Sequence, residues 1–563
     1  MRAMRAHRVD LGARRWWVLG ALVLAMLAIG LDVTVLSVAL PTLAGALRAS
    51  TAQLQWFVAA YTLVLAAALL PGGLLGDRYG RKKMLLISLA IFGAGSVACA
   101  YAGSAEAFIA ARVIAGLGAA FAIPLSLSTL TVLFSEKERP RAVGVWAAAN
   151  FLALPVGPIV GGWLLTRYWW GWVFLINVPV VVLGIIALVV LLPESRNPQR
   201  PRLDPAGVLT SSAGLAVLTY GIIQAGQHGW GDAVALVAMI AGLLVLVAFG
   251  LWEHRLGRQP GSRPLVDMRL FASAGFTWGT VLAAVGMFTM VGVLFTAPQH
   301  FQAVLGTDAM GSGVRLLPLI AGVVLGAGGA DRIAARAGAK VTVASGFALL
   351  AAALLLGATT HMTSGYGFVA AWTALLGTGM GLALATAASA ALGELSAAQA
   401  GVGSAVIQTV QRVGAPFGAA ILGSVLNSGY RSRLDLAGLP ASAAHAARDS
   451  VFAAIAVAHK LGLAPLLDSA RTAFVHGMDV IAGAVATLAH PRTVMIFQRP
   501  LQVATRALGA TRTAGRRGRS GEPQGNCTAA ENARRCWLPP RLAPAVPLTC
   551  PRRAPVVPCR GHT

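Results

Sequence analysis

Charged side chains are scarce in this sequence. Only 12% of its 563 residues are Asp, Glu, Lys or Arg, whereas 56% are hydrophobic. Soluble domains carry about 25% charged residues, so this composition argues against a soluble globular protein. Acidic residues are scarcer still, with 20 Asp and Glu against 45 Lys and Arg. We expect the formal excess of +25 to mark one side of a membrane protein rather than a surface that binds nucleic acid.

Cysteine is also rare, and its placement predicts no metal site. Cys99 lies in the apolar body, and the other four cysteines lie beyond residue 525 with a spacing that matches no zinc-binding pattern. The sequence lacks a Gly-x-x-x-x-Gly-Lys-Ser/Thr loop, which indicates that ATP is not the energy source. No cluster of catalytic residue types falls at one membrane depth. We therefore expect no enzyme and no cofactor.

Long apolar runs take the place of these missing features. A bilayer core of about 30 Å is crossed by about 20 residues of helix. Lipid offers no hydrogen-bond partners, so the backbone N–H and C=O groups of a span must bond to one another, as they do in a helix. The sequence therefore predicts an all-α, polytopic transmembrane helix bundle with fourteen spans, of which the last is the weakest. The predicted spans are 16–40, 54–76, 84–103, 107–134, 141–165, 172–193, 205–225, 233–252, 275–298, 313–330, 340–359, 366–392, 402–427 and 472–489.

Basic residues predict which side of the membrane each loop faces. Five arginines precede the first span, and further Lys and Arg recur in alternate loops, at 78–83, 137–141, 196–202, 255–269 and 332–340. Because cytoplasmic loops are enriched in Lys and Arg, we expect residues 1–15 to form a basic cytoplasmic N-terminus. The first span is too long for a signal-peptide core, so it is expected to be retained. Residues 428–472 then form an external loop.

The sequence changes character near residue 490. Residues 490–563 are rich in Arg, Pro and Cys and contain no lysine. Two explanations stay open: a basic disordered tail, or a shifted reading frame that replaces the true end of the fourteenth span. We assign this segment no fold and no function.

The most informative stretch is Gly73-Leu-Leu-Gly-Asp-Arg-Tyr-Gly-Arg-Lys-Lys83, a dense cluster of charged residues between two predicted spans. It resembles the signature loop of the major facilitator superfamily of membrane transporters. Its glycines permit tight turning, and Asp77 can cap the next helix or pair with an arginine. The resemblance implies a latch between two conformations, made by Gly73, Asp77, Arg78, Gly80, Arg81 and Lys82. The alternative is that the basic residues only set topology.

A carboxylate and a guanidinium lie inside predicted spans, where charge is expensive and therefore a functional candidate. Asp32 lies about 24 Å above the start of the first span, and Arg112 lies about 8 Å from the outer end of the fourth, at a similar depth. The stretch Leu31–Pro41 resembles the first-helix motif of the fourteen-span drug:proton antiporter group, and Phe108–Gly118 resembles a motif of the superfamily whose arginine is linked to proton coupling. Ser37 and Ala115 depart from these patterns. The alternatives are a structural salt bridge for Arg112 and helix packing for Asp32.

The fifth span contains Ala153-Leu-Pro-Val-Gly-Pro-Ile-Val-Gly-Gly162. Pro158 removes a backbone donor, and Gly157 and Gly161 form a small-xxx-small face for close helix contact. With Gly162, these residues resemble the antiporter motif that marks exporters, although Ala153 stands where the family has glycine. The alternative is the generic glycine content of membrane helices.

The second half of the chain repeats the first weakly, as expected of transporters built from two halves. Ala330-Asp-Arg-Ile-Ala-Ala-Arg336 echoes the signature loop, with Ala334 in place of its glycine. Gln408 and Arg412 lie in the thirteenth span and are candidates for a central cavity, the alternative being packing alone. The predicted domains are a six-helix half at 16–193, two extra helices at 205–252 and a second six-helix half at 275–489.

The resemblance implies a monomeric transporter of the bacterial cell membrane that exports small lipophilic molecules by proton antiport and alternating access. Its partners would be the lipid bilayer, protons and a lipophilic substrate. The Ala-, Gly- and Arg-rich composition is typical of a GC-rich bacterium and suggests antibiotic export. Two alternatives stay open. One is a proton-coupled importer or facilitator of a metabolite, and the other is a non-transporting or inactive membrane protein with an altered C-terminus.

Overall fold

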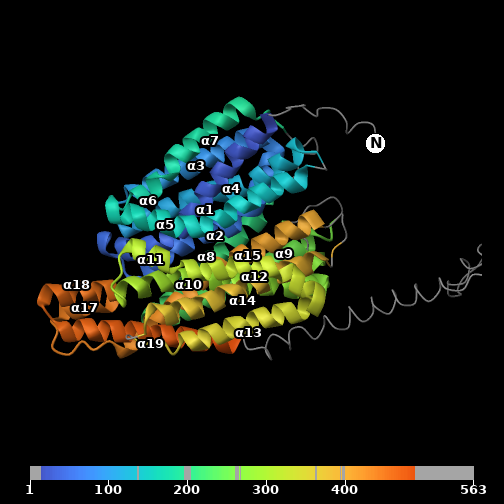
Figure 1. Cartoon of the computed structure of the whole chain (residues 1–563). Coiled ribbons are helices and arrows are strands. Elements are labelled where there is room, and N and C mark those ends of the chain that lie inside the picture. Colours follow the sequence, from blue (N-terminus) through green and yellow to red (C-terminus); the bar gives the residue numbers. More distant parts are fainter. Residues whose placement is uncertain are drawn as a thin grey trace, which may run out of the picture. The chain divides into compact units, whose positions relative to one another are not determined.

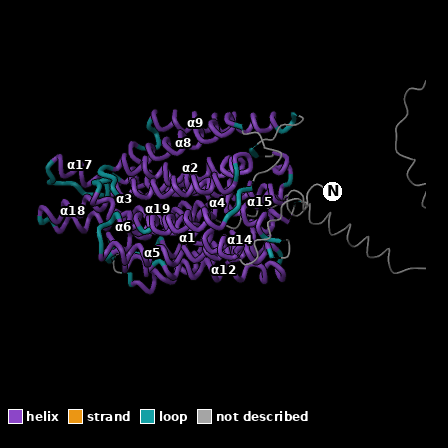
Figure 2. Tube along the Cα trace, turned by 90° about the horizontal axis from the view of Figure 1, so that it is seen from above, coloured by secondary structure: helices purple, strands orange, loops and turns teal. Residues whose placement is uncertain are grey.

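The computed structural model describes residues 14–135, 138–195, 204–259, 265–266, 268–361, 364–393, 395 and 400–488. Within these ranges the chain forms helices joined by short turns, and it contains no strand (Figure 1). The long helices run alongside one another (Figure 2). The predicted all-α bundle is confirmed for this part of the chain.

The first seven helices form one group, called here the N-terminal group. Helix α1 packs against α5 and against α7, and α4 packs against α2 and α3. The bounds are α1 Arg14–Ala46, α2 Thr51–Tyr79, α3 Arg81–Ala100, α4 Ala105–Leu133, α5 Arg139–Arg167, α6 Trp172–Leu175 and α7 Asn177–Leu191.

A second group, called here the C-terminal group, comprises α10–α16 and α19, and the pair α8 and α9 lies beside α2. The π-helix η3 interrupts the thirteenth predicted span between α15 and α16. The bounds are α8 Pro205–His228, α9 Ala233–Leu256, η2 Met268–Ala272, α10 Ala274–Ala303, α11 Ala309–Arg315, α12 Leu317–Ala337, α13 Ala339–Gly357, α14 Tyr366–Gly393, α15 Ala400–Phe417, η3 Gly418–Leu422, α16 Gly423–Arg433, α17 Ala441–Asp449, α18 Val451–Leu461 and α19 Ala464–Leu488.

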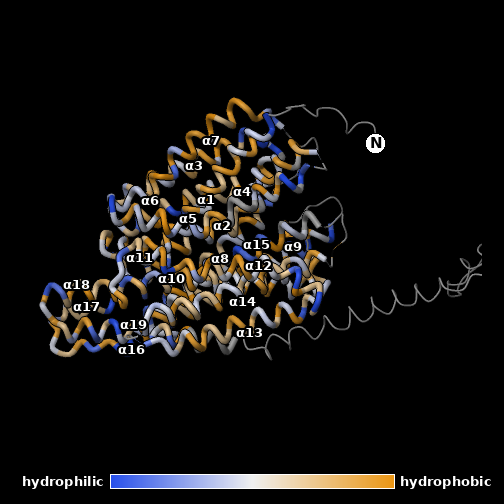
Figure 3. Tube along the Cα trace, viewed as in Figure 1, coloured by the Kyte–Doolittle hydropathy of each residue, from blue (hydrophilic) through white to orange (hydrophobic). Residues whose placement is uncertain are grey.

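Eleven helical segments among the described residues are long and apolar enough to cross a membrane. The predicted spans at α5, α15 and α19 are not in this set, so the total of fourteen stays a prediction. Hydrophilic residues gather toward the ends of the helices, and hydrophobic residues occupy their middle parts (Figure 3). This distribution fits a bundle whose lateral surface faces lipid.

The two ends of the bundle differ in charge. We call the end that carries Arg14, Arg81 and Arg139 the basic end. Arg15 at the start of α1 forms an ion pair of 2.8 Å with Glu138 at the start of α5, which joins two helices there. On α8, the backbone N–H of Gly207 donates to Asp204 Oδ1 at 3.1 Å, so the first turn is capped by a side chain.

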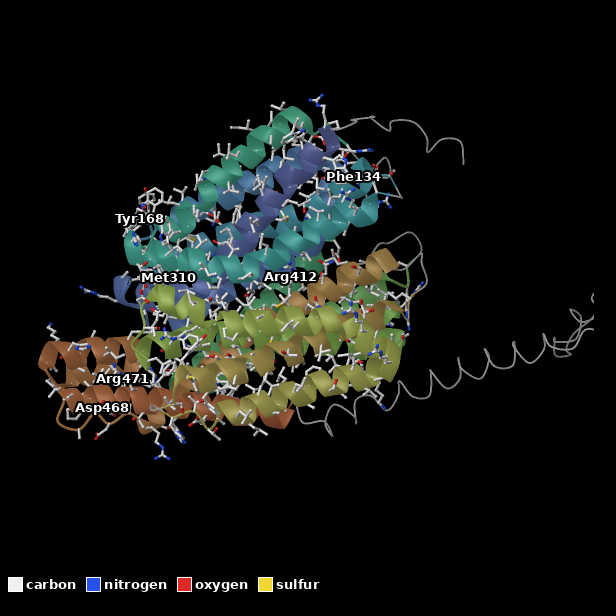
Figure 4. The ribbon with its side chains drawn as sticks, viewed as in Figure 1. Phe134, Tyr168, Met310, Arg412, Asp468 and Arg471 are labelled. Atoms are coloured by element: carbon white, nitrogen blue, oxygen red, sulfur yellow. The ribbon has the colours of Figure 1, made fainter. Side chains whose placement is uncertain are left out.

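The two helix groups meet near the opposite end of the bundle. Gln302 Nε2 of α10 donates to the carbonyl of Val38 in α1 at 3.1 Å. Gly162 of α5 packs against Met310 of α11, and a Cβ atom added at Gly162 would lie 2.7 Å from Met310 Cα. Figure 4 shows the labelled Met310 between the two groups. Small residues therefore permit backbone-to-backbone contact here.

The segment 428–472, expected to be a loop, contains helices. Helix α16 continues to Arg433, and α17, α18 and the start of α19 follow. The Ser450 hydroxyl accepts from the backbone N–H of Ala453 at 3.1 Å and caps α18. Thr51 Oγ1 donates to the carbonyl of Asp449 at 2.8 Å, which ties this segment to α2. The alanine-rich composition of 441–449 favours helix, and the loop expectation gave that propensity too little weight.

Candidate proton and substrate site

A buried ion pair joins α1 to α4 inside the N-terminal group. Arg112 Nη1 lies 2.6 Å from Asp32 Oδ2, and each side chain is only 1% exposed. The sequence placed these two residues at a similar depth, and the structure brings them into direct contact. Two opposite charges so far from solvent stay ionised together only while they remain paired.

Neighbouring helices satisfy the remaining polar atoms of the pair. Arg112 Nε donates to the carbonyl of Phe57 at 3.1 Å, and the guanidinium lies 4.2 Å from the centroid of the Tyr61 ring. Asn177 Nδ2 donates to Asp32 Oδ1 at 3.3 Å and lies 3.5 Å from Ser96 Oγ. The pair is therefore held by α1, α2, α4 and α7 at once. Any change in its charge acts on all four helices.

Sequence reasoning missed three of these residues. Asn177 is an amide inside the otherwise apolar run 172–193, and that isolation was the available signal. Ser96 and Tyr61 carried no comparable signal, because hydroxyl-bearing residues are common in helices of this kind. The Tyr61 hydroxyl is buried and has no hydrogen-bond partner among the described residues.

The geometry gives the ion pair a chemical role. With Asp32 ionised, the pair is neutral. A proton on Asp32 would cancel the carboxylate and leave the Arg112 guanidinium buried without its counter-ion, a loss of about 3–5 kcal/mol. Such a loss favours a rearrangement in which Arg112 meets another acceptor or water. The pair can therefore convert one proton into a movement of helices.

The signature loop turns sharply between α2 and α3. Gly80 has φ of +115°, a conformation that side chains with a Cβ atom rarely adopt. A Cβ atom added there would also lie 2.6 Å from Glu194 Oε1. The Glu194 carboxylate accepts from the backbone N–H groups of Lys82 at 3.2 Å and Lys83 at 3.1 Å. Glu194, which the sequence did not single out, therefore stabilises the start of α3.

The other latch candidates lie in or beside the same turn between α2 and α3. Lys82 Nζ donates to the carbonyl of Val189 in α7 at 2.7 Å, and the Arg78 guanidinium lies 5.5 Å from the Tyr79 ring. The backbone N–H of Arg81 donates to the carbonyl of Ser195 at 2.9 Å. Gly73 lies on α2 facing Pro124 of α4. The side chain of Asp77 lies outside the described part of the chain, so its capping and pairing stay predictions.

The antiporter motif packs α5 against both helix groups. Gly157 contacts Thr34, and Gly161 would place a Cβ atom 2.9 Å from Val35 Cγ1, so both glycines face α1 close to Asp32. Gly162 faces α11 instead, and the carbonyl of Pro158 contacts Gly313 of the same helix. One stretch of helix thus supports the ion pair on one face and the contact between groups on another.

Gln408 and Arg412 lie one turn apart on the same face of α15. Arg412 is half-buried and has no hydrogen-bond or ion-pair acceptor among the described residues, and Gln408 Nε2 lies 3.5 Å from Ser404 Oγ. Arg412 interacts electrostatically with Tyr61, which stacks on Arg112. Figure 4 shows Arg412 between the two helix groups. The structure thus places a cation of the C-terminal group near the ion pair of the N-terminal group.

Two apolar cavities flank the opposite face of α15. One, of about 330 Å³, lies between α2, α8, α9, η2 and α15, and the other, of about 350 Å³, lies between α8, α10 and α15. Val410, Val413 and Phe417 line both. Among the described residues there is no cluster of three or more His, Cys, Asp or Glu that could hold a metal ion.

Apolar helices of membrane-spanning length, packed in two groups of which the first encloses a buried ion pair, are the architecture of a polytopic membrane protein. The chain belongs to the Major Facilitator Superfamily, whose family model matches residues 22–419. This membership confirms the expectation of a transporter rather than an enzyme.

Curated relatives match most of the chain. The tetracenomycin C resistance and export protein of Streptomyces glaucescens is 31% identical over 88% of this chain and 94% of its own length. The multidrug efflux pump LfrA of Mycolicibacterium smegmatis is 33% identical over 84% of this chain and 94% of its own. The methyl viologen resistance protein SmvA of Salmonella typhimurium is 33% identical over 84% and 96%.

Solved structures share the fold at low identity. A bacterial homologue of the human lysosomal transporter Spinster, in an inward-facing and unoccupied conformation, matches 86% of this chain and 98% of its own with a TM-score of 0.59 and 19% identity. A D-xylose-proton symporter matches 84% and 97%, with a TM-score of 0.53 and 16% identity. These likenesses support the helix arrangement alone.

Proposed function

We propose that this chain exports small lipophilic molecules, drugs or antibiotics, from a bacterial cell in exchange for protons. Relatives named for tetracenomycin C export and multidrug efflux, each matched over most of both chains, support the direction and the cargo class. The glycines of the antiporter motif, packed between α1 and α11, agree with this assignment.

The observation that carries the proposal is the Asp32–Arg112 pair at 2.6 Å. While Asp32 is ionised, the pair adds no net charge, and Arg412 remains as a half-buried cation on α15. A proton on Asp32 leaves Arg112 without its counter-ion and raises the local positive charge. Because like charges repel, the protonated state disfavours a lipophilic cation and releases it. For an uncharged cargo, the helix movement that follows loss of the pair supplies the coupling instead. Proton and cargo then exclude each other, which is the requirement for antiport.

Alternating access follows from the contacts between the two groups. The basic end is proposed to face the cytoplasm, since Lys and Arg concentrate there. The contacts at Val38 and Gln302, and at Gly162 and Met310, then close the external side. Export requires these contacts to separate while the two helix groups approach each other at the basic end. The protein is proposed to work as a monomer, with residues 16–193 and 275–489 as the two moving halves.

A reconstitution experiment tests the proposal. The purified full chain in liposomes, with an imposed pH gradient, should move the uncharged dye Nile red or the cation tetraphenylphosphonium against its concentration gradient. Asp32→Asn, which mimics the protonated carboxyl, should abolish proton-driven movement and weaken the binding of tetraphenylphosphonium, while binding of uncharged Nile red is still detected. Exposed Arg167, changed to Gln, serves as a control and should transport like wild type. Unchanged proton-driven export by Asp32→Asn would contradict the assignment.

The importer alternative makes the opposite prediction about direction. If the chain were a proton-driven importer, collapsing the gradient in cells would lower the internal dye concentration. For an exporter the same treatment raises it. A steady dye level in both gradient conditions would support the non-transporting alternative.

A further inference from the structure

Helix α15, which forms the first part of the thirteenth span, has two chemically distinct faces. One carries Gln408 and Arg412 toward the candidate site. The other carries Val410, Val413 and Phe417 toward the two apolar cavities. At 100° per residue these sets lie on opposite sides of the helix. Helix α15 therefore forms a wall between the candidate site and two compartments on its far side, called here the side chambers.

The side chambers have the size and chemistry of small-molecule sites. Their volumes of about 330 and 350 Å³ fall in the usual range of roughly 300–1,000 Å³ for ligand pockets. No charged residue lines either of them, and only Ser211 and Thr409 contribute polar side chains. An occupant of these chambers must therefore be apolar and uncharged where it is enclosed.

The rims of the chambers face the surface expected to contact lipid. Val281 and Val285 on the rim of the second chamber are 38% and 40% exposed. Helix α9, which covers the first chamber through Leu246 and Phe249, exposes large apolar side chains along its other faces, including Leu243 and Leu244. Molecules dissolved in the bilayer can reach these rims without crossing water.

The wall itself contains features of a movable element. Pro416 lies within α15, and the π-helix η3 begins directly after Phe417. Such interruptions bend helices and recur at functional sites. Gly414 lies against the carbonyl of Ala284, and Gly418 lies against the carbonyl of Phe288. The backbones of the thirteenth span and of α10 are therefore in direct contact here. Residues 400–417 would have to move about this bend for a molecule to pass from the chambers to the candidate site.

We propose that the side chambers bind the apolar ring system of the exported molecule as it enters from the bilayer, before it reaches Arg412. This inference rests on the proposed function, because it concerns the path of the same cargo. Two chambers of similar volume, divided by three side chains of α15, suit compact ring systems rather than one extended lipid chain. The extra helices α8 and α9 thereby acquire a role, since they form the outer walls.

Photolabelling tests occupancy directly. The full chain in liposomes is irradiated with an uncharged adamantane diazirine, and the labelled peptides are mapped by mass spectrometry. Label is expected on residues 406–417 of α15 and near Ala67 of α2, and excess Nile red should displace it. Label confined to the exposed face of α9 would overturn the proposal. Displacement by added phospholipid but not by Nile red would also overturn it, because the occupant would then be a lipid chain.

Filling the chambers tests their place on the transport path. Ala67→Phe and Ala284→Phe add a ring to the first and second chamber, respectively. Together they are expected to lower labelling and to raise the KM for Nile red by about tenfold, equivalent to about 1.4 kcal/mol. Ala248→Phe makes the same chemical change at an exposed position of α9 and should alter neither.

Each outcome separates the two proposals. An unchanged KM in the filled variants, with expression and thermal stability equal to wild type, would overturn the side-chamber proposal while leaving proton-driven export intact. Labelling of the chambers in a wild-type protein that never moves Nile red or tetraphenylphosphonium under a pH gradient would instead contradict the proposed function. Val413→Ala enlarges both chambers without adding bulk, and it should lower the KM for larger ring systems.

Discussion

At the scale of single residues, the Asp32–Arg112 pair shows how far sequence reasoning reaches. The cost of charge in lipid was enough to single out both residues, and helix rise was enough to place them at similar depth. Their actual contact depends on how α1 and α4 rotate about their axes, which packing decides. The hydrogen bond from Asn177 depends in addition on α7, so it was not predictable from the motif stretches.

The first prediction concerns the charge balance of the Asp32–Arg112 pair. Asp32→Asn leaves Arg112 buried without a counter-ion, and we expect a loss of about 3–5 kcal/mol of stability. The double variant Asp32→Asn/Arg112→Gln removes both charges and should recover most of that loss. Thermal denaturation in detergent measures both effects. Proton-driven transport should be absent in the single and the double variant alike.

Two results would contradict this charge-balance account. One is a double variant less stable than either single variant, which would mean that packing rather than charge dominates. The other is restored transport in the double variant, which would mean that the pair is only structural.

Tyr61 makes the second prediction, because its hydroxyl is buried without a hydrogen-bond partner. Tyr61→Phe removes an unsatisfied group and retains the ring that stacks on Arg112 at 4.2 Å. An unpaired buried polar group costs about 1–3 kcal/mol, so the variant should be at least as stable as wild type. Tyr61→Leu, which also removes the ring, should be less stable. A marked loss of stability in Tyr61→Phe would show that the hydroxyl has a partner.

At the scale of helices, sequence periodicity and length predicted most of the elements and few of their interruptions. Each of the predicted spans corresponds to a helix or to consecutive helices, because a long apolar run has few other ways to satisfy its backbone. The Asp204–Pro205 pair predicts the start of α8 for a local reason, since it combines a cap with a proline in the first turn. The π-helix η3 begins two residues after Pro416, and that proline was a local signal of an interruption that the prediction of one continuous span left unused.

The third prediction concerns two adjacent glycines of α5, Gly161 and Gly162. Gly161 packs against Val35 within the N-terminal group, whereas Gly162 packs against Met310 across the two groups. Gly161→Val should therefore lower thermal stability, by about 1–3 kcal/mol as for other overpacked sites. Gly162→Val should leave that stability nearly unchanged and weaken closure of the two groups. Thermal denaturation and transport rate, measured side by side, separate the two effects.

Gly20 is the control for the glycine pair, because nothing lies within 4 Å of a Cβ atom added there. Gly20→Ala should be neutral or slightly stabilising, as expected for alanine in a helix interior. Equal destabilisation by Gly161→Val and Gly162→Val would contradict the assignment of one glycine to each kind of contact.

At the scale of the whole molecule, few polar contacts among the described residues hold the two groups together at the end opposite the basic end. One is the hydrogen bond from Gln302 to Val38, and another joins Gln55 Nε2 of α2 to Ser424 Oγ of α16 at 3.5 Å. Transporters of this kind exchange between states of similar free energy, so single contacts can shift their populations.

This balance makes the fourth prediction. Gln302→Leu removes one hydrogen bond, worth about 0.5–1.5 kcal/mol, and should raise the population open at this end about two- to twelvefold. Maleimide labelling of Met310→Cys, followed peptide by peptide, reports that opening. Thr359→Val alters a hydroxyl at the same end that bonds only within its own turn, and should leave labelling unchanged. Equal labelling in Gln302→Leu and its parent would contradict the assigned contact.

Among the described residues, the groups that hydrogen-bond to or stack on the Asp32 and Arg112 side chains come from the first 177 residues of the chain: Phe57, Tyr61 and Asn177, with Ser96 beyond them. The part of the protein that senses acid is therefore contiguous in the gene. A hybrid that joins residues 1–193 to the later half of a relative with another drug spectrum should keep its response to pH and inherit a different cargo. Evolution could broaden the chemical repertoire of such a pump by recombination without rebuilding its energy supply.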